Sequence, residues 1–251
     1  MSDQTQTFPG DDPGASRQTA VYVYEAPVYV YEAPVRLWHW INAAAIMVLC
    51  VTGYFIGSPP PSMQIAEAYD QFVFGYIRFT HFAAGIILTV CFFGRIYWAF
   101  VGNHHARQIF IPRVWTAAFW KELGHEIMWY AMIAKQPMKY VGHNPLATLV
   151  MHIMFVWGIV FMIFTGLALY GEGAGMGSWQ YNLFSSWLIP LFGQSQDVHT
   201  WHHLGLWVIV CFAIIHIYAA VREDIMSRQS IISSMFSGWR TFRDGGPGNG
   251  H

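Results

Sequence analysis

Histidine is the residue type in this sequence best placed to do chemistry. Four of the twelve histidines, His39, His81, His202 and His216, lie in or at the edge of long stretches that are almost free of charge. An imidazole carries a proton or binds a metal, and hydrocarbon surroundings offer its nitrogens no partner. A single histidine of this kind can also serve only as a hydrogen-bonding contact between helices, so the arrangement of the four decides between the two interpretations.

The spacing of His202 and His216 puts both on one face of a helix. They are 14 residues apart in one apolar stretch. In an α-helix this separation falls about 40° short of four full turns and spans about 21 Å along the axis. His203 is about 100° round from His202 and points elsewhere. One helix is therefore predicted to carry an imidazole near each of its ends.

The elements that must position these histidines are membrane spans. Charged residues make up 11% of the chain, against about 25% in soluble domains. This composition excludes an ordinary soluble enzyme, a disordered chain and a nucleic-acid-binding protein. Four apolar stretches of about 19–25 residues are each long enough to cross a hydrocarbon core of roughly 30 Å. The predicted spans are Trp38–Ile56, Phe79–Val101, Leu146–Tyr170 and Thr200–Ala220.

We therefore predict an all-α protein, an integral membrane four-helix bundle in a lipid bilayer. Its domains are a cytoplasmic N-terminal tail (1–35), a transmembrane domain (36–222) and a cytoplasmic C-terminal tail (223–251). Eleven of the thirteen Lys and Arg residues lie before the first span, after the fourth span or in the loop between the second and third spans. Basic residues favour the cytoplasmic side, so both termini are predicted there, with the protein in the cell inner membrane. The N-terminal tail repeats one heptapeptide, YVYEAPV, at 22–28 and 29–35.

Successive spans cross the membrane in opposite directions, so the four histidines are predicted to lie at two depths. The first span starts inside and the second starts outside, so His39 shares the inner depth with His216, and His81 shares the outer depth with His202. Two imidazoles on opposite sides of a haem iron fill both axial positions, which leaves a centre that passes single electrons. No CxxCH motif occurs, so such a haem is not covalently attached.

Several neighbouring residues are candidates to support the haems. Arg36 and Arg78 each precede a candidate ligand by three residues and are predicted either to pair with a haem carboxylate or to anchor the span at lipid headgroups. Gly53, Gly85 and Gly94 would leave room beside a macrocycle or would serve ordinary helix packing.

Several ordered motifs resemble one known family. The segments EAPVRLWHWINA, GYIRFTHFAAG, GHNP, DVHTWHHLG and HIYAAVREDIMS are similar to the membrane b-type cytochrome subunit of uptake nickel–iron hydrogenases. The resemblance covers roughly residues 22 to 240. The wider group includes the di-haem cytochrome b subunits of membrane formate dehydrogenases. The family's haem ligands fall on the same four histidines.

The resemblance implies an electron-transfer subunit without an active site of its own. It would anchor the hydrogenase small and large subunits on the periplasmic face. Electrons would pass from the iron–sulfur subunit to a haem b at His81 and His202, then to a haem b at His39 and His216, and then to quinone. His143 and Asn144 are the candidate quinone contacts, although Asn-Pro at a helix start is also an ordinary cap.

Two alternatives remain open at this point. One is a transporter or channel that uses the histidines as a proton relay. The other is a cytochrome b anchor for a different periplasmic dehydrogenase.

Overall fold

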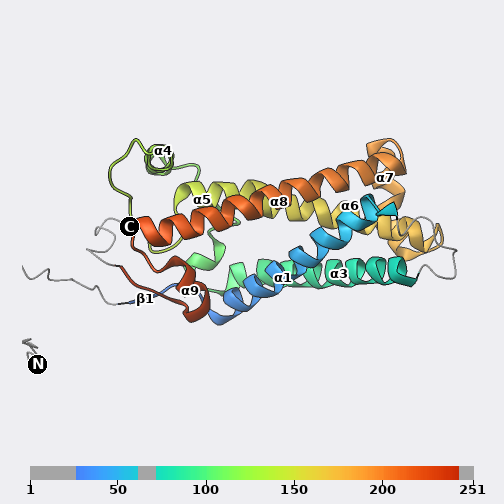
Figure 1. Ribbon diagram of the computed structural model, residues 1–251, viewed down its shortest axis with the longest axis horizontal. Helices are drawn as coiled ribbons and strands as arrows, with labels where there is room; N and C mark the ends of the chain where they lie inside the picture. The colour runs from blue at the N-terminus through green and yellow to red at the C-terminus, as the bar shows by residue number, and fades with distance from the viewer. Residues whose placement is uncertain (1–26, 62–71, 243–251) are drawn as a thin grey trace, which may run out of the picture.

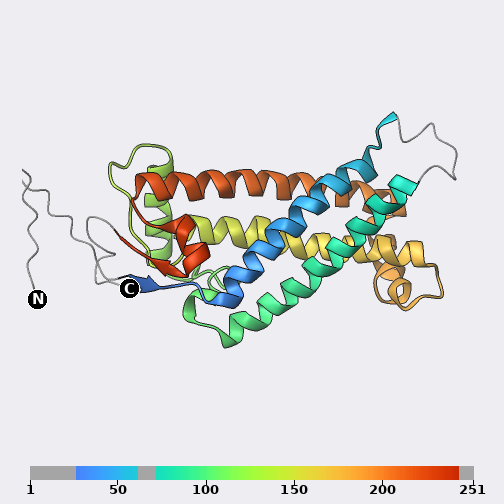
Figure 2. The same cartoon turned by 60° about the horizontal axis from the view of Figure 1, so that its bottom comes forward.

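Four long helices form the body of the protein, as shown by the computed structural model, which describes residues 27–61 and 72–242. They run side by side along the long axis of the molecule in both views (Figures 1 and 2). By length and composition each can cross a membrane. The first is α1 (Ala33–Gly57), the second α3 (Phe72–Val101) and the fourth α8 (Ser195–Met226). The third is continuous through α5 (Pro145–Val150), the π-helical η3 (Met151–Trp157) and α6 (Gly158–Ala174).

The bundle is apolar on the outside as well as inside. Helix α1 packs along α3, and α6 packs along α8. Buried Leu88, Phe92, Phe155 and Phe212 belong to the central core. Large apolar side chains are also exposed along the outer faces of the helices, among them Met47, Phe79, Val90, Phe93 and Ile214. Such a surface is stable against lipid rather than water, and an α-helix suits lipid because its backbone hydrogen bonds are made within the segment. The predicted all-α membrane bundle is confirmed.

One end of the bundle, which we call the termini end, carries the short elements. These are β1 (Val28–Tyr29), η2 (His104–Arg107), α4 (Ala117–Tyr130), α9 (Ile231–Ser237) and β2 (Trp239–Arg240). Strands β1 and β2 pair antiparallel, with Val28 opposite Arg240 and Tyr29 opposite Trp239. The two ends of the described chain therefore meet there (Figure 1).

The opposite end, which we call the far end, is closed by η4 (Tyr181–Ser185) and α7 (Ser186–Phe192). The hydroxyl of buried Ser185 donates to the Ala168 carbonyl at 2.6 Å, which ties this segment to α6. Both figures place α7 at the end away from β1 and α9.

The repeated heptapeptide is only partly described. Residues 22–26 of the first copy, 22–28, lie outside the described residues, as do most of the N-terminal tail and residues 243–251 of the C-terminal tail. The second copy forms the entry to α1: Val30 is fully buried, and Glu32 accepts from Trp98 Nε1 and Asn103 N, both at 2.9 Å. It is therefore a packed part of the termini end and not a loose leader.

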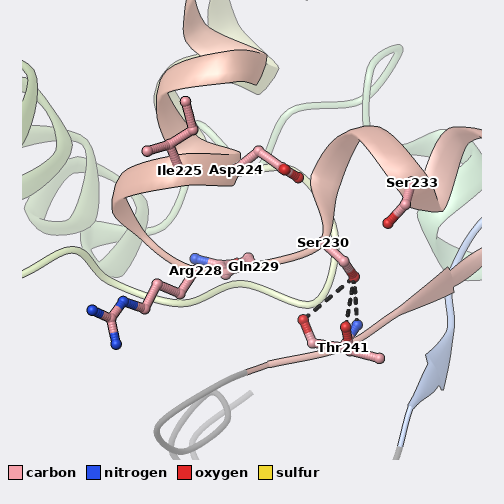
Figure 3. Close-up of a pocket in the computed structure, with 7 residues that line it drawn as sticks. All are labelled: Asp224, Ile225, Arg228, Gln229, Ser230, Ser233 and Thr241. Atoms are coloured by element: carbon pink, nitrogen blue, oxygen red, sulfur yellow. Dashed lines mark hydrogen bonds between the residues drawn. The ribbon is translucent and has the colours of Figure 1, made fainter.

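A polar pocket lies where α8 turns into α9 at the termini end (Figure 3). It is lined by residues between Asp224 and Ser233 and by Thr241. The Ser230 hydroxyl accepts from Thr241 N at 2.7 Å across it. None of the four candidate histidines lines this pocket, so it is separate from them.

Candidate haem sites

At the far end of the bundle, His81 of α3 faces His202 of α8. Their ring centres are 6.5 Å apart and their planes are inclined by 75°. An imidazole nitrogen bound to a metal lies about 2 Å from it, and the ring centre lies about 1 Å further back, so two rings sharing one metal are about 6 Å apart. The pair therefore fits a single metal held from both sides.

At the termini end, His39 of α1 faces His216 of α8 in the same way. These ring centres are 6.3 Å apart, with an angle of 50° between the planes. His216 also stacks on Phe212, one turn earlier in α8, at 5.5 Å. Helix α8 thus supplies one imidazole to each pair, and α1 and α3 supply the others. This donor set suits a haem iron with two axial imidazoles.

Two threonines fix the ring orientation of the far-end pair. Thr52 Oγ1 lies 2.9 Å from His81 Nδ1, and Thr165 Oγ1 lies 2.7 Å from His202 Nδ1. Each hydroxyl donates its own hydrogen to a helix carbonyl, at 2.6 Å for Thr52 and 2.8 Å for Thr165. The threonine oxygen must then accept from Nδ1–H, which leaves the Nε2 lone pair of each histidine available to a metal.

A glycine follows each of these threonines and makes room for the imidazole. A Cβ atom on Gly53 would lie 3.1 Å from His81 Cε1, and one on Gly166 would lie 3.2 Å from His202 Cε1. The Thr-Gly dipeptides of α1 and α6 therefore have the same role, because in each the threonine orients an imidazole and the glycine leaves space for it. Sequence reasoning considered Gly53 but missed Thr52, Thr165 and Gly166. The signal available was the repetition of Thr-Gly in two apolar spans.

Gly85 and Gly94, also considered from the sequence, are not close-approach positions. A Cβ on Gly85 would make only an ordinary contact with Leu49, at 3.9 Å, and one on Gly94 would meet nothing within 4 Å. Both fit the alternative of plain helix packing.

The termini-end pair has a different polar environment. His39 Nδ1 is buried and has no hydrogen-bond partner. Nearby, the guanidinium of Arg95 is buried between the rings of Trp38 and Phe110, 5.3 Å from each. It donates to the Ala106 carbonyl at 2.5 Å, while its Nε and Nη1 have no partner. Arg95 is the only Asp, Glu, Lys or Arg in the four predicted spans. This isolation was the feature of the sequence that could have marked it as a candidate site residue.

The two arginines singled out from the sequence have other contacts in the structure. Arg36 donates through Nη1 to the Phe236 carbonyl in α9. Arg78 lies with its guanidinium 5.9 Å from the centre of the Phe82 ring.

His143 and Asn144 lie at the entry to the third long helix, at the termini end. Asn144 caps α5, since its Oδ1 accepts from Ala147 N at 2.6 Å, and Pro145 follows in the first turn. Its Nδ2 donates to Glu126 Oε2 at 3.2 Å. The His143 ring lies against Tyr31, and its Nδ1 is buried without a partner. Burial, together with Arg240, lowers the pKa of His143 to about 3, so this ring is neutral.

Three further histidines make contacts outside the two pairs. His152 Nδ1 bonds the carbonyl of Ile109, in the turn after η2, at 3.0 Å, and its Nε2 accepts from Trp157 of the same helix at 3.2 Å. His203 packs against Trp207, and a Cβ on Gly57 would lie 2.6 Å from its Nδ1. His199 bonds the Ser195 carbonyl at 3.0 Å.

Comparisons with known proteins place the chain in one family. The profile described as "Prokaryotic cytochrome b561" matches residues 30–238. The "Probable Ni/Fe-hydrogenase B-type cytochrome subunit" of Azotobacter chroococcum is 61% identical over 231 residues, 92% of each chain. The protein of that name from Cupriavidus necator is 60% identical over 97% of this chain and 96% of its own. The "Probable Ni/Fe-hydrogenase 1 B-type cytochrome subunit" of Escherichia coli K12 is 47% identical over 89% of this chain and 92% of its own.

The matched region, residues 30–238, contains both histidine pairs. A b-type cytochrome carries haem b, and the donor sets described above suit that group. The chain therefore belongs to the prokaryotic cytochrome b561 family, in the group of B-type cytochrome subunits of Ni/Fe-hydrogenases.

Proposed function

We propose that this chain anchors a Ni/Fe-hydrogenase at the membrane and passes electrons from the iron–sulfur subunit of that enzyme across the bilayer to quinone. The observation that carries the proposal is the pair of facing imidazoles at each end of the bundle, 6.5 Å apart at one end and 6.3 Å at the other. Relatives that carry hydrogenase in their names are 47–62% identical to this chain over the aligned residues.

Each histidine pair would hold one haem b, His81 with His202 and His39 with His216. The haem would supply one-electron oxidation and reduction when bound. Thr52 and Thr165 keep the Nε2 atoms of the far-end pair directed toward the metal position. Arg78 at the far end and Arg36 at the termini end remain the predicted partners of haem carboxylates, and buried Arg95 offers two further donors at the termini end.

The direction of transfer follows from the charges. Basic residues concentrate at the termini end, so this end is cytoplasmic and the far end is periplasmic in the cell inner membrane. The hydrogenase small and large subunits then dock over η4 and α7. The far-end histidine pair is the electron entry and the termini-end pair is the exit.

Quinone is reduced beside His143 and Asn144 at the termini end. The Asn144 side-chain amide donates one of its two hydrogens to Glu126, which leaves the other for a ligand. His143 has a buried Nδ1 without a hydrogen-bond partner. Both are able to hold a quinone carbonyl. His216 of the exit pair is one of the groups whose charge lowers the pKa of His143, so the proposed quinone position lies near that pair.

Haem stoichiometry tests the proposal. Pyridine haemochrome analysis of the purified hydrogenase complex is expected to give two haem b per chain. His81→Ala and His216→Ala should each lose one haem and keep the other, and His203→Ala should keep both. A complex without haem bands would support the histidine-relay alternative, and loss of neither haem in the two ligand variants would refute the pairing.

A further inference from the structure

Glu126 in α4 is a buried carboxyl group that takes no part in the two histidine pairs. Its side chain is 1% exposed. Oε2 accepts from Asn144 Nδ2 at 3.2 Å, while Oε1 is buried and has no hydrogen-bond partner. A buried carboxylate that lacks a counterion is costly, so a group in this position favours its protonated form.

No cation neutralises Glu126 within the described residues around it. Arg222 and Glu223 approach it from α8, the Tyr140 hydroxyl forms a hydrogen bond with the carboxyl group from the loop before α5, and Glu122 lies one turn earlier in α4. Arg222 is occupied elsewhere, since it pairs with Glu223 at 3.1 Å and donates to the Trp129 carbonyl at 2.8 Å. Burial raises the pKa of Glu126 to about 7, with Glu223 as the next contribution. The group therefore gains and loses a proton near neutral pH.

The position of Glu126 connects the aqueous side with the predicted quinone contacts. Glu122 is half-buried and lies one turn before Glu126 on the same face of α4. On the other side, Glu126 contacts Asn144 directly, and His143 is the next residue in the chain. His143 is neutral, so it has no proton to give as an acid in this region. Glu126 is therefore a titratable group in direct contact with Asn144, one of the two predicted quinone contacts.

We infer that Glu126 is the proton donor to a quinone bound beside Asn144; this rests on the proposed quinone reduction. Conversion of a quinone to a quinol takes two electrons, which come from hydrogen oxidation through the hydrogenase, and two protons, one on each carbonyl oxygen. The proton on Glu126 moves to the oxygen nearer to Asn144, forming an O–H bond as the carboxyl O–H bond breaks. The carboxylate is reprotonated from water past Glu122. The second oxygen takes its proton from the aqueous solvent.

The test uses the complete hydrogenase complex in membrane vesicles. Hydrogen first reduces the haems, and their reoxidation is then followed optically after addition of a short-chain quinone or of ferricyanide, which accepts an electron without a proton. Glu126→Gln keeps the acceptor for Asn144 and removes the proton. We expect reoxidation by quinone to slow at least about tenfold and to lose its pH dependence near pH 7, with ferricyanide reoxidation unchanged. Glu172→Gln, at the far end, is the matched control and should behave as wild type in both assays.

Each other outcome has a separate meaning. Wild-type quinone rates and an unchanged pH profile in Glu126→Gln would overturn the role of Glu126 while leaving quinone reduction intact. Equal slowing with ferricyanide would show a structural role only and would also overturn it. Wild-type complex that ferricyanide reoxidises and quinone does not would refute the proposed function itself. An infrared carboxyl band that changes on quinone reduction and is missing in Glu126→Gln would support the assignment independently of rate.

Discussion

The hydroxyl oxygen of Thr165 lies 2.7 Å from Nδ1 of His202, and the residue after Thr165 is a glycine that leaves the imidazole its space. The same relationship recurs between Thr52 and His81 at 2.9 Å. Both histidines of the far-end pair are thus held by a helix other than their own. A ligand fixed in this way has a set tautomer and a set ring angle before any metal arrives.

Thr165→Val should therefore change the electronic properties of the far-end haem without removing it. The variant keeps the side-chain shape and removes the oxygen that accepts from His202 Nδ1–H. A weaker donor ligand favours the reduced iron, so the midpoint potential of one haem should rise by roughly 59 mV if the relative affinity changes tenfold. Redox titration of both haems measures this.

Thr89→Val is the control for that measurement. Thr89 also donates to a helix carbonyl, at 2.7 Å to Gly85, but none of its hydrogen bonds in the described structure reaches a histidine. Unchanged potentials in both variants would contradict the proposed support of His202.

Gly166→Val should reduce haem content to one per chain. A Cβ at this position already lies 3.2 Å from His202 Cε1, and the branched side chain would push the imidazole away from its partner. Gly94→Val, at a position where a Cβ meets nothing within 4 Å, should keep both haems. Pyridine haemochrome analysis of the two variants decides the matter, and equal haem content would show that the glycine has no part in ligand placement.

Glu126 should make the stability of the protein fall as the pH rises. Its pKa is raised from 4.5 to about 7 in the folded state by burial and by Glu223. A group with a raised folded pKa contributes stability that is complete below pH 4.5 and is lost as the pH rises through about 7. Glu126→Gln lacks the titrating carboxyl group and therefore this pH-dependent loss of stability. Its melting temperature in detergent, relative to that of the wild type, should increase between pH 5 and pH 8. A constant difference across this range would contradict the raised pKa.

Reporter fusions test the predicted orientation. Green fluorescent protein fused after residue 251 should fluoresce, because it folds in the cytoplasm. Alkaline phosphatase fused after residue 178, between α6 and η4, should be active, because it requires the periplasm. The reverse pattern would invert the topology and place the electron entry at the His39–His216 pair.

The sequence alone was sufficient for the four spans and for the two histidine pairs as a geometric prediction. Span positions follow from uninterrupted apolar runs, because hydrocarbon excludes charged groups over a fixed thickness. His202 and His216 share a face because the helical period is fixed. The structure lengthens every span: α8, for example, runs from Ser195 to Met226 where Thr200–Ala220 was predicted. Apolarity marks the lipid-covered part of a helix, and the helix itself continues until its backbone meets a cap or a turn.

Only the tertiary structure showed what supports those histidines and what lies at the termini end. Thr165 and His202 are 37 residues apart and Glu126 and Asn144 are 18 apart, so no local pattern in the chain connects them. Burial of Glu126 depends on how α4 folds back against α5 and α8, because an amphipathic segment specifies that one face is covered and not which partner covers it. Helical periodicity is a property of consecutive residues, whereas hydrogen bonds and pKa values depend on which segments pack together in space.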